Sequence, residues 1–101
     1  MSTDFYQVIA RYYPLAGQTE TVLALLVDLA AASRTEPANI AYDFFRGVEN
    51  ADEIVIIESY TDAAGFAAHR EAEHFERIGL GQIIPLLENR VVVKMNASLD
   101  A

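Results

Sequence analysis

Two side chains of this sequence could transfer protons near neutral pH, Glu58 and His69. Glu58 is a lone carboxylate in the apolar run IVIIESY. If it points into an apolar pocket, desolvation raises its pKa and makes it a stronger base. A neutral imidazole such as His69 takes up or releases a proton without large tuning. Both are candidate general bases, and the sequence leaves the choice between them open.

A structural role competes with the catalytic one for both residues. Glu58 could face a subunit interface and pair with an arginine there. His69 ends a predicted helix, where the helix dipole favours a cation without any catalytic purpose. His74 follows five residues later, a spacing that does not place both rings on one helix face, and no third ligand type accompanies them. We therefore expect no metal site.

Aromatic side chains could supply the other parts of a proton-transfer site. Tyr42 and Tyr60 are candidate hydrogen-bond donors to an oxyanion, and Tyr12 is a further one. The candidate substrate-binding residues are Phe44, Arg46, Ile56, Phe66, His74 and Phe75. Packing in the core is the simpler explanation for each ring. Arg46 could pair with Glu58, bind an acidic substituent, or be a plain surface arginine.

These residues need a scaffold, and the apolar pattern predicts one. Residues 5–13 are β-branched and aromatic and predict a strand that Pro14 ends. Apolar residues recur at helical spacing over residues 19–33 and predict a helix. Pro37 follows shortly afterwards and cannot continue that helix.

Two further strands are predicted at residues 39–48 and 53–60, joined by a polar four-residue hairpin connection. Charge predicts how they pair. In an odd register, where the numbers of two opposing residues add up to an odd number, Asp43 would lie opposite Glu58. That would be an unfavourable pair of like charges. An even register instead groups Tyr42, Phe44 and Arg46 with Ile56, Glu58 and Tyr60. The sequence thus favours an aromatic pocket that holds one carboxylate.

Beyond residue 60 the pattern becomes helical and then extended. Thr61 is a candidate cap for a helix that begins at Asp62. A second helical stretch covers residues 75–87, where two glycines and Pro85 predict a break or kink. Residues 90–95 predict the last strand. The order β-α-β-β-α-β indicates an α+β fold of the ferredoxin-like kind, an antiparallel sheet with its helices on one face.

The strand at residues 53–60 carries apolar side chains on both of its faces. A sheet with one face in water alternates apolar and polar residues instead. Helices can cover only one face in this arrangement. We therefore expect the other face to pair with the same sheet of a second copy, in a symmetric homodimer.

Composition limits the class of protein. The 101 residues fit one domain, residues 1–101. A net charge of -8 repels nucleic acid and anionic membranes, so neither is expected as a partner. No cysteine is present, and no nucleotide-binding, serine-hydrolase or zinc-protease motif occurs. Without a leader pattern or an apolar stretch of about 18 residues, a cytoplasmic location is expected.

Two stretches carry a family resemblance. SRTEPANIAYDFFR, residues 33–46, leads into the second strand, and IIESYTDAAGFAAHREAEHF, residues 56–75, runs from the third strand into the following helix. Together with VIARYYP near the start and IIPLLENRVVV near the end, they resemble the antibiotic biosynthesis monooxygenase domain across nearly the whole chain.

The resemblance implies a dimeric α/β barrel, two ferredoxin-like units joined through their sheets, each with an apolar pocket. Members of this family oxidise anthrones or dihydroquinones with O2 and without flavin, haem or metal. A cofactor-independent monooxygenase acting on a small quinol- or anthrone-like aromatic is the function that the resemblance implies. An isomerase of a small polar metabolite, favoured if Arg46 and His69 form a charged pocket, is one alternative. A non-catalytic binding protein for flat apolar ligands is another.

The chain departs from the family pattern at several positions. Ala38 stands where a glycine is common, and Tyr60 stands where many members have tryptophan. The haem-degrading branch of the family relies on an asparagine on the first strand, a tryptophan on the second helix and a later histidine. This chain has Ala10 or Arg11, His69 and Gly79 around those positions. Haem degradation is therefore not expected.

Overall fold

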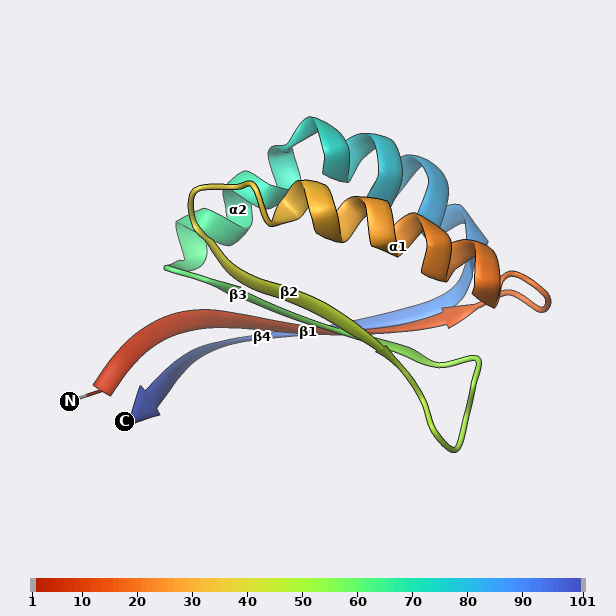
Figure 1. Ribbon diagram of the computed structural model, residues 1–101, viewed down its shortest axis with the longest axis horizontal. Coiled ribbons are helices and arrows are strands. Elements are labelled where there is room, and N and C mark those ends of the chain that lie inside the picture. Colours follow the sequence, from red (N-terminus) through yellow and green to blue (C-terminus); the bar gives the residue numbers. More distant parts are fainter. Residues whose placement is uncertain (1, 101) are drawn as a thin grey trace.

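The structure is a computed structural model that describes residues 2–100. Its elements are β1 (Ser2–Pro14), α1 (Thr19–Ser33), β2 (Asn39–Arg46), β3 (Ile54–Tyr60), α2 (Ala63–Glu71), the π-helical η1 (Phe75–Ile83), the short 3-10 helix η2 (Ile84–Leu86) and β4 (Leu87–Asp100). The strands form one antiparallel sheet in the order β2-β3-β1-β4, and the helices lie over one of its faces (Figure 1). This confirms the α+β, ferredoxin-like fold. Within residues 2–100 no helix has the length and apolar character needed to cross a membrane.

The core lies between the sheet and the helices. Val22, Leu26 and Leu29 recur along one side of α1 and are buried against the sheet. Ile54 and Ile56 of β3 meet them from below and are fully buried. Each such side chain stabilises the fold by roughly 1.5–3 kcal/mol through the apolar surface that it removes from water.

The strand register decides which side chains point toward the helices. β2 and β3 pair Tyr42 with Glu58 and Phe44 with Ile56, so the predicted even register is confirmed. β1 places Val8 opposite Glu58 on one side and opposite Lys94 of β4 on the other. Because cross-strand partners share a face, these four strands carry a continuous row of side chains on the helix-covered face.

Several predicted boundaries were wrong. β2 ends at Arg46 rather than at residue 48, because the hairpin begins with a bond from the Gly47 amide to the Glu53 carbonyl. The helix after β3 begins at Ala63 and is capped by Asp62, not Thr61: the Asp62 carboxylate accepts from the Gly65 amide at 2.8 Å. The last strand extends well beyond residues 90–95, because its backbone pairs with β1 over most of that strand's length whatever the side chains.

The predicted break within residues 75–87 is confirmed beside Pro85, where the π-helical η1 ends at Ile83 and the 3-10 helix η2 follows. A second break, which was not predicted, lies before this stretch. α2 ends at Glu71, and Ala72 adopts an extended conformation with ψ 145°. η1 then starts at Phe75. Gly79 leaves room for the Phe75 ring, since a Cβ atom at Gly79 would lie 3.1 Å from Phe75 Cδ1. The break matters because it turns His74 back toward the end of α2.

Ala38, which stands where the family pattern has glycine, touches the start of α2. A Cβ atom at Gly65 would lie 2.6 Å from the Ala38 Cβ, a separation that is too short for two carbon atoms. Gly65→Ala would normally stabilise a helix by roughly 0.5–1 kcal/mol. Here we expect it to lower the free energy of unfolding by about 1–3 kcal/mol, because the two methyl groups overlap.

Urea denaturation of Gly65→Ala, Ala38→Gly and the double variant measures this overlap as a double-mutant cycle. Ala38→Gly should restore most of the stability that Gly65→Ala removes. Additive effects of the two substitutions would show that the methyl groups do not compete for the same space.

Candidate functional site

A cavity of about 260 Å³ opens between the sheet and the helices that cover it. Val8, Ala10 and Tyr12 of β1 form its floor, and Tyr42 and Glu58 stand at its side toward β2 and β3. The small side chain of Ala10, between two larger neighbours on the same face, provides the depth. A cavity of this size suits a small molecule.

The helices contribute an aromatic roof. Phe66 and His69 of α2 and Phe75 of η1 line the cavity from above. Their rings also pack on one another: the His69 centroid lies 5.0 Å from that of Phe75 and 6.1 Å from that of Phe66, the latter pair being stacked at 21°. Aromatic walls on two sides favour a flat ligand.

The rim of the cavity is positively charged. Arg70 follows His69 at the end of α2, and Arg90 and Lys94 come from β4, with Val92 between them. All of these side chains are exposed, and those of β4 lie across β1 from Glu58. The cavity therefore joins one carboxylate, an aromatic interior and a cationic rim.

Glu58 is buried, with 6% of its surface exposed. Burial raises its pKa to about 7, and the carboxylate of Glu36 adds to the increase, whereas a hydrogen bond from the Tyr60 hydroxyl at 2.7 Å opposes it. The bond occupies Oε1; within residues 2–100 no hydrogen bond reaches Oε2. Since Glu58 faces the helices, the interpretation that it lies at a subunit interface with an arginine was wrong.

His69 is almost completely buried, with 1% exposed, and burial lowers its pKa despite a hydrogen bond to Glu36. Its Nδ1 lies 2.8 Å from Glu36 Oε2, and its Nε2 lies 3.6 Å from Glu58 Oε1. A carboxylate only accepts, so Nδ1 carries the ring proton. The unprotonated Nε2 then faces Glu58.

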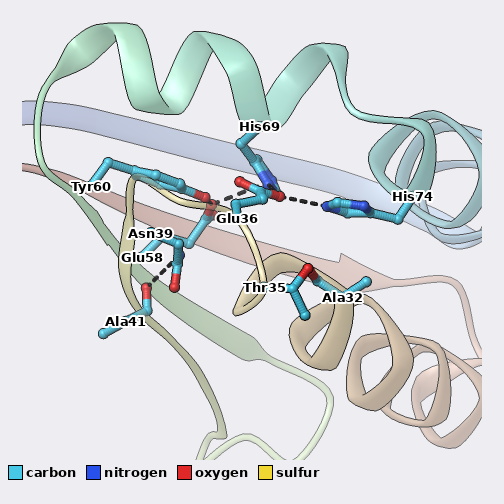
Figure 2. Close-up of polar contacts among 9 residues, drawn as sticks. All are labelled: Ala32, Thr35, Glu36, Asn39, Ala41, Glu58, Tyr60, His69 and His74. Atoms are coloured by element: carbon cyan, nitrogen blue, oxygen red, sulfur yellow. Dashed lines mark hydrogen bonds and ion pairs between the residues drawn. The ribbon is translucent and has the colours of Figure 1, made fainter.

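Glu36 also contacts His74, whose Nε2 lies 2.5 Å from the same Oε2 atom, so that one carboxylate oxygen joins two histidines (Figure 2). The three potential ligand atoms lie within 4.8 Å of one another. The expectation that the histidines do not converge and lack a third ligand was therefore wrong, because His74 lies beyond the end of α2. A two-histidine, one-carboxylate set could hold a divalent cation such as zinc or iron. Without a cation, the ring N–H groups of His69 and His74 donate hydrogen bonds to the Glu36 Oε2 atom directly.

The tyrosines of the site stay protonated at neutral pH. Burial raises the pKa of Tyr12 to about 12 and that of Tyr42 well above its ordinary value. Tyr42 is held in place by Arg34, whose guanidinium donates two hydrogen bonds to the Tyr42 carbonyl at 2.6 and 3.0 Å. Neutral phenols in a cavity wall can donate hydrogen bonds to a developing oxyanion.

The structure brings together only some of the predicted site residues. Those that line the cavity are Tyr12, Tyr42, Glu58, Phe66, His69 and Phe75. Tyr60 and His74 stand behind it, one bonded to Glu58 and the other to Glu36. Phe44 and Ile56 share the face of Glu58 but belong to the core beneath α1. Arg46 lies away from the cavity, where it bonds to Glu20 at 2.6 Å and to the Ala51 carbonyl.

Glu36, Arg70, Arg90 and Lys94 were missed as site residues. The signal for Arg90 and Lys94 was present: with Val92 they alternate along the last strand and therefore share one face. Arg70 stands directly beside His69. Glu36 lies in the stretch SRTEPANIAYDFFR that carries the family resemblance, but its approach to His69 depends on how residues 34–38 fold back over the sheet, which that stretch does not reveal.

Comparisons with known proteins agree with this fold. Residues 5–79 match the family model described as "Antibiotic biosynthesis monooxygenase". A crystal structure of an antibiotic biosynthesis monooxygenase is 31% identical, covers 91% of this chain and 97% of its own, and superposes with a TM-score of 0.84. PA3566 from Pseudomonas aeruginosa is 27% identical over 92% of this chain and 93% of its own, with a TM-score of 0.84.

Protein SO0527 from Shewanella oneidensis is 19% identical, covers 97% of this chain and 95% of its own, and has a TM-score of 0.88, which supports the fold alone. No functionally curated protein matches the chain significantly.

The raised pKa of Glu58 makes folding stability depend on pH. The folded protein holds this proton up to about pH 7, whereas an unfolded glutamate loses it near pH 4.5. The contribution of Glu58 is therefore fully present below pH 4.5 and lost as pH rises toward 7. Glu58→Gln should escape this loss, so its free energy of unfolding relative to wild type should increase between pH 4.5 and 8 by up to about 3 kcal/mol.

Urea denaturation at several pH values measures this difference. Glu49→Gln is the matched control, because it removes the same charge from an exposed hairpin position. A pH-independent difference between Glu58→Gln and wild type would contradict the raised pKa.

Proposed function

Because the chain belongs to the antibiotic biosynthesis monooxygenase family, we propose that it oxidises a small quinol- or anthrone-like aromatic with O2 and without a bound cofactor. The observation that supports this most is Glu58, a buried carboxylate with a pKa of about 7 in the wall of an aromatic cavity. A base of that pKa is partly ionised at neutral pH and can take a proton from an activated C–H or phenol. The flat cavity walls suit an aromatic substrate.

The proposed reaction needs little from the protein beyond a base and a dry, shaped site. Glu58 removes one proton from the substrate, and the resulting carbanion is electron-rich enough to reduce O2. For an anthrone, CH2 and O2 become C=O and H2O, so one oxygen atom enters the product and the other leaves as water. Tyr42 lines the cavity and donates a hydrogen bond to the oxyanion. The Tyr60 hydroxyl keeps its hydrogen bond to Glu58 and thereby lowers the pKa of that carboxyl group.

His69 acts in this proposal as the proton partner of Glu58. Its Nε2 is unprotonated and faces Glu58 Oε1 at 3.6 Å. Glu36 holds Nδ1 and thereby fixes the tautomer, in the way that a carboxylate orients histidines in other active sites. The choice between the two candidate bases falls on Glu58, since both ring nitrogens of His69 already face a carboxylate.

The isomerase alternative depended on a charged pocket formed by Arg46 with His69. Arg46 is engaged by Glu20 at the far end of β2, so that support is missing. Non-catalytic binding of a flat ligand uses the same cavity and differs from the proposal only in turnover. The expected cytoplasmic location remains part of the proposal.

We further infer that the protein is a homodimer joined through the uncovered face of its sheet. Ile9 pairs with Ile57 on one side and Val93 on the other, and all three point away from the helices. Phe45, Val91 and Val93 on the same face are about half exposed. Exposed apolar side chains on an open sheet are typical of an interface, and a symmetric second copy covers them at least cost.

Purified protein stripped of metal with a chelator should consume O2 in the presence of an anthrone or a dihydronaphthoquinone, faster than the substrate autoxidises. The rate should rise with pH through about 7, because the ionised form of Glu58 is the base. Glu58→Gln should lower the rate about 100-fold or more, as expected for loss of a general base. An oxygen electrode measures the uptake.

Glu49→Gln, which changes the charge outside the cavity, should leave the rate unchanged. Uptake that persists in Glu58→Gln would contradict the assignment of the base. Uptake that disappears on chelation and returns with zinc or iron would instead assign a metal to Glu36, His69 and His74. Binding of a flat aromatic without uptake would favour the non-catalytic alternative.

Val93→Glu should convert the dimer to a monomer, because it places a charge in the proposed apolar interface. Size-exclusion chromatography with light scattering measures the mass of both proteins. Val27→Glu is the matched control: Val27 is 57% exposed on α1, Val93 is 49% exposed, and only Val93 lies on the sheet. A wild-type protein that is monomeric at micromolar concentration would overturn the interface.

A further inference from the structure

The basic residues of this protein differ in whether they form ion pairs. The chain has seven basic residues against fifteen acidic ones. Four arginines form ion pairs with carboxylates, and the pairs are Arg11 with Glu53, Arg34 with Asp43, Arg46 with Glu20 and Arg77 with Glu73. The other three basic residues are Arg70, Arg90 and Lys94, and among residues 2–100 no carboxylate lies within ion-pair distance of them. All three line the same cavity.

The three cations approach the cavity from two sides. Arg90 and Lys94 lie opposite Tyr12 and Val8 of β1, so they share the helix-covered face of the sheet. Arg70 comes from the end of α2, where its guanidinium lies 5.8 Å from the centre of the Phe66 ring. That contact holds the charge against the aromatic roof. Such a clustering of unpaired cations in a chain of net charge -8 indicates a negatively charged ligand.

The register gives the separation between the cations and the base. Glu58 pairs with Val8, and Val8 pairs with Lys94, so the three residues form one row across the sheet. The Cα atoms of Glu58 and Lys94 are then two strand spacings apart, about 10 Å. A ligand that places its reacting atom at Glu58 and a group at its opposite end on the rim must span this distance. A fused two-ring molecule with one substituent has such a length.

A role for these cations in the proposed dimer does not fit their position. Val91 and Val93 of β4 point to the uncovered face, whereas Arg90 and Lys94 point to the helix side. A second copy seated on the uncovered face therefore leaves the rim open.

We propose that the substrate is an aromatic anion, whose carboxylate or phosphate group is bound by Arg90, Lys94 and Arg70 at the end remote from Glu58. This inference rests on the proposed function, because it assumes that the cavity holds an aromatic substrate. Hydrogen bonds from arginine and lysine to such a group are charge-assisted and about twice as strong as neutral ones. The rim also offsets the repulsion that a protein of net negative charge exerts on an anionic substrate.

Binding of three air-stable probes tests this without turnover. 2-Naphthol is neutral, 6-hydroxy-2-naphthoate carries a carboxylate remote from its hydroxyl, and 2-naphthyl phosphate carries a phosphate. Isothermal titration calorimetry should show that the full-length protein binds at least one anionic probe about tenfold or more tightly than 2-naphthol. The preference should shrink as salt is raised. Whichever anion binds more tightly identifies the group that the substrate carries.

Arg90→Met and Lys94→Met should each remove most of this preference and leave the affinity for 2-naphthol within about twofold. Arg77→Met is the matched control, because it removes one positive charge from an exposed pair outside the cavity and should keep the preference. In the triple variant, Arg70, Arg90 and Lys94 are all replaced by methionine. Light scattering should find it in the same oligomeric state as wild type.

Equal affinity of the wild type for all three probes would overturn this inference while leaving the proposed aromatic substrate in place. A preference that survives in the triple variant would also overturn it, as would dissociation of the triple variant into monomers. Failure of every probe to bind would contradict the proposed aromatic substrate itself, together with this inference.

Discussion

The organisation of this protein depends on one unfavourable interaction, the burial of the Glu58 carboxylate beneath the helices. An ionised carboxylate loses much of its hydration there, and its pKa rises to about 7. The fold offsets part of that cost with the hydrogen bond from the Tyr60 hydroxyl, and the unprotonated Nε2 of His69 lies 3.6 Å from the same carboxylate oxygen. Tyr60 sits two residues along the same strand, so the donor and its acceptor are positioned by a single element.

The same constraint explains the irregular segments around the site. Glu36 reaches His69 because residues 34–38 fold over the end of the sheet, and His74 reaches Glu36 because α2 stops at Glu71. One carboxylate oxygen thus ties the loop after α1 to the end of α2 and the start of η1 (Figure 2). A longer α2 would carry His74 away, so the break between the two helices is a requirement of the site.

The sequence predicted the fold and the face of each strand, but not the place of each residue along it. Repulsion between Asp43 and Glu58 was enough to select the even register, and that register put Tyr42 beside Glu58. The same alternation also placed Arg46 on the correct face, although it lies beyond the part of β2 that borders the cavity. Period-two patterning contains no information about where a helix stops covering a sheet, which is a tertiary property.

The placement of charges in the cavity relates the role of the base, Glu58, to that of the cationic rim. In the proposed reaction a negative charge leaves Glu58 when the proton arrives and appears on the substrate, where the Tyr42 hydroxyl donates a hydrogen bond to it. Arg90 and Lys94 lie beyond β1 on β4, at the exposed rim of the cavity, where they bind the anionic substituent of the proposed substrate. An anionic substituent at the rim would neutralise those cations and keep them from pairing with Glu58 itself. The separation of about two strand spacings thus allows one cavity to hold a carboxylate base of nearly neutral pKa and a cationic anchor together.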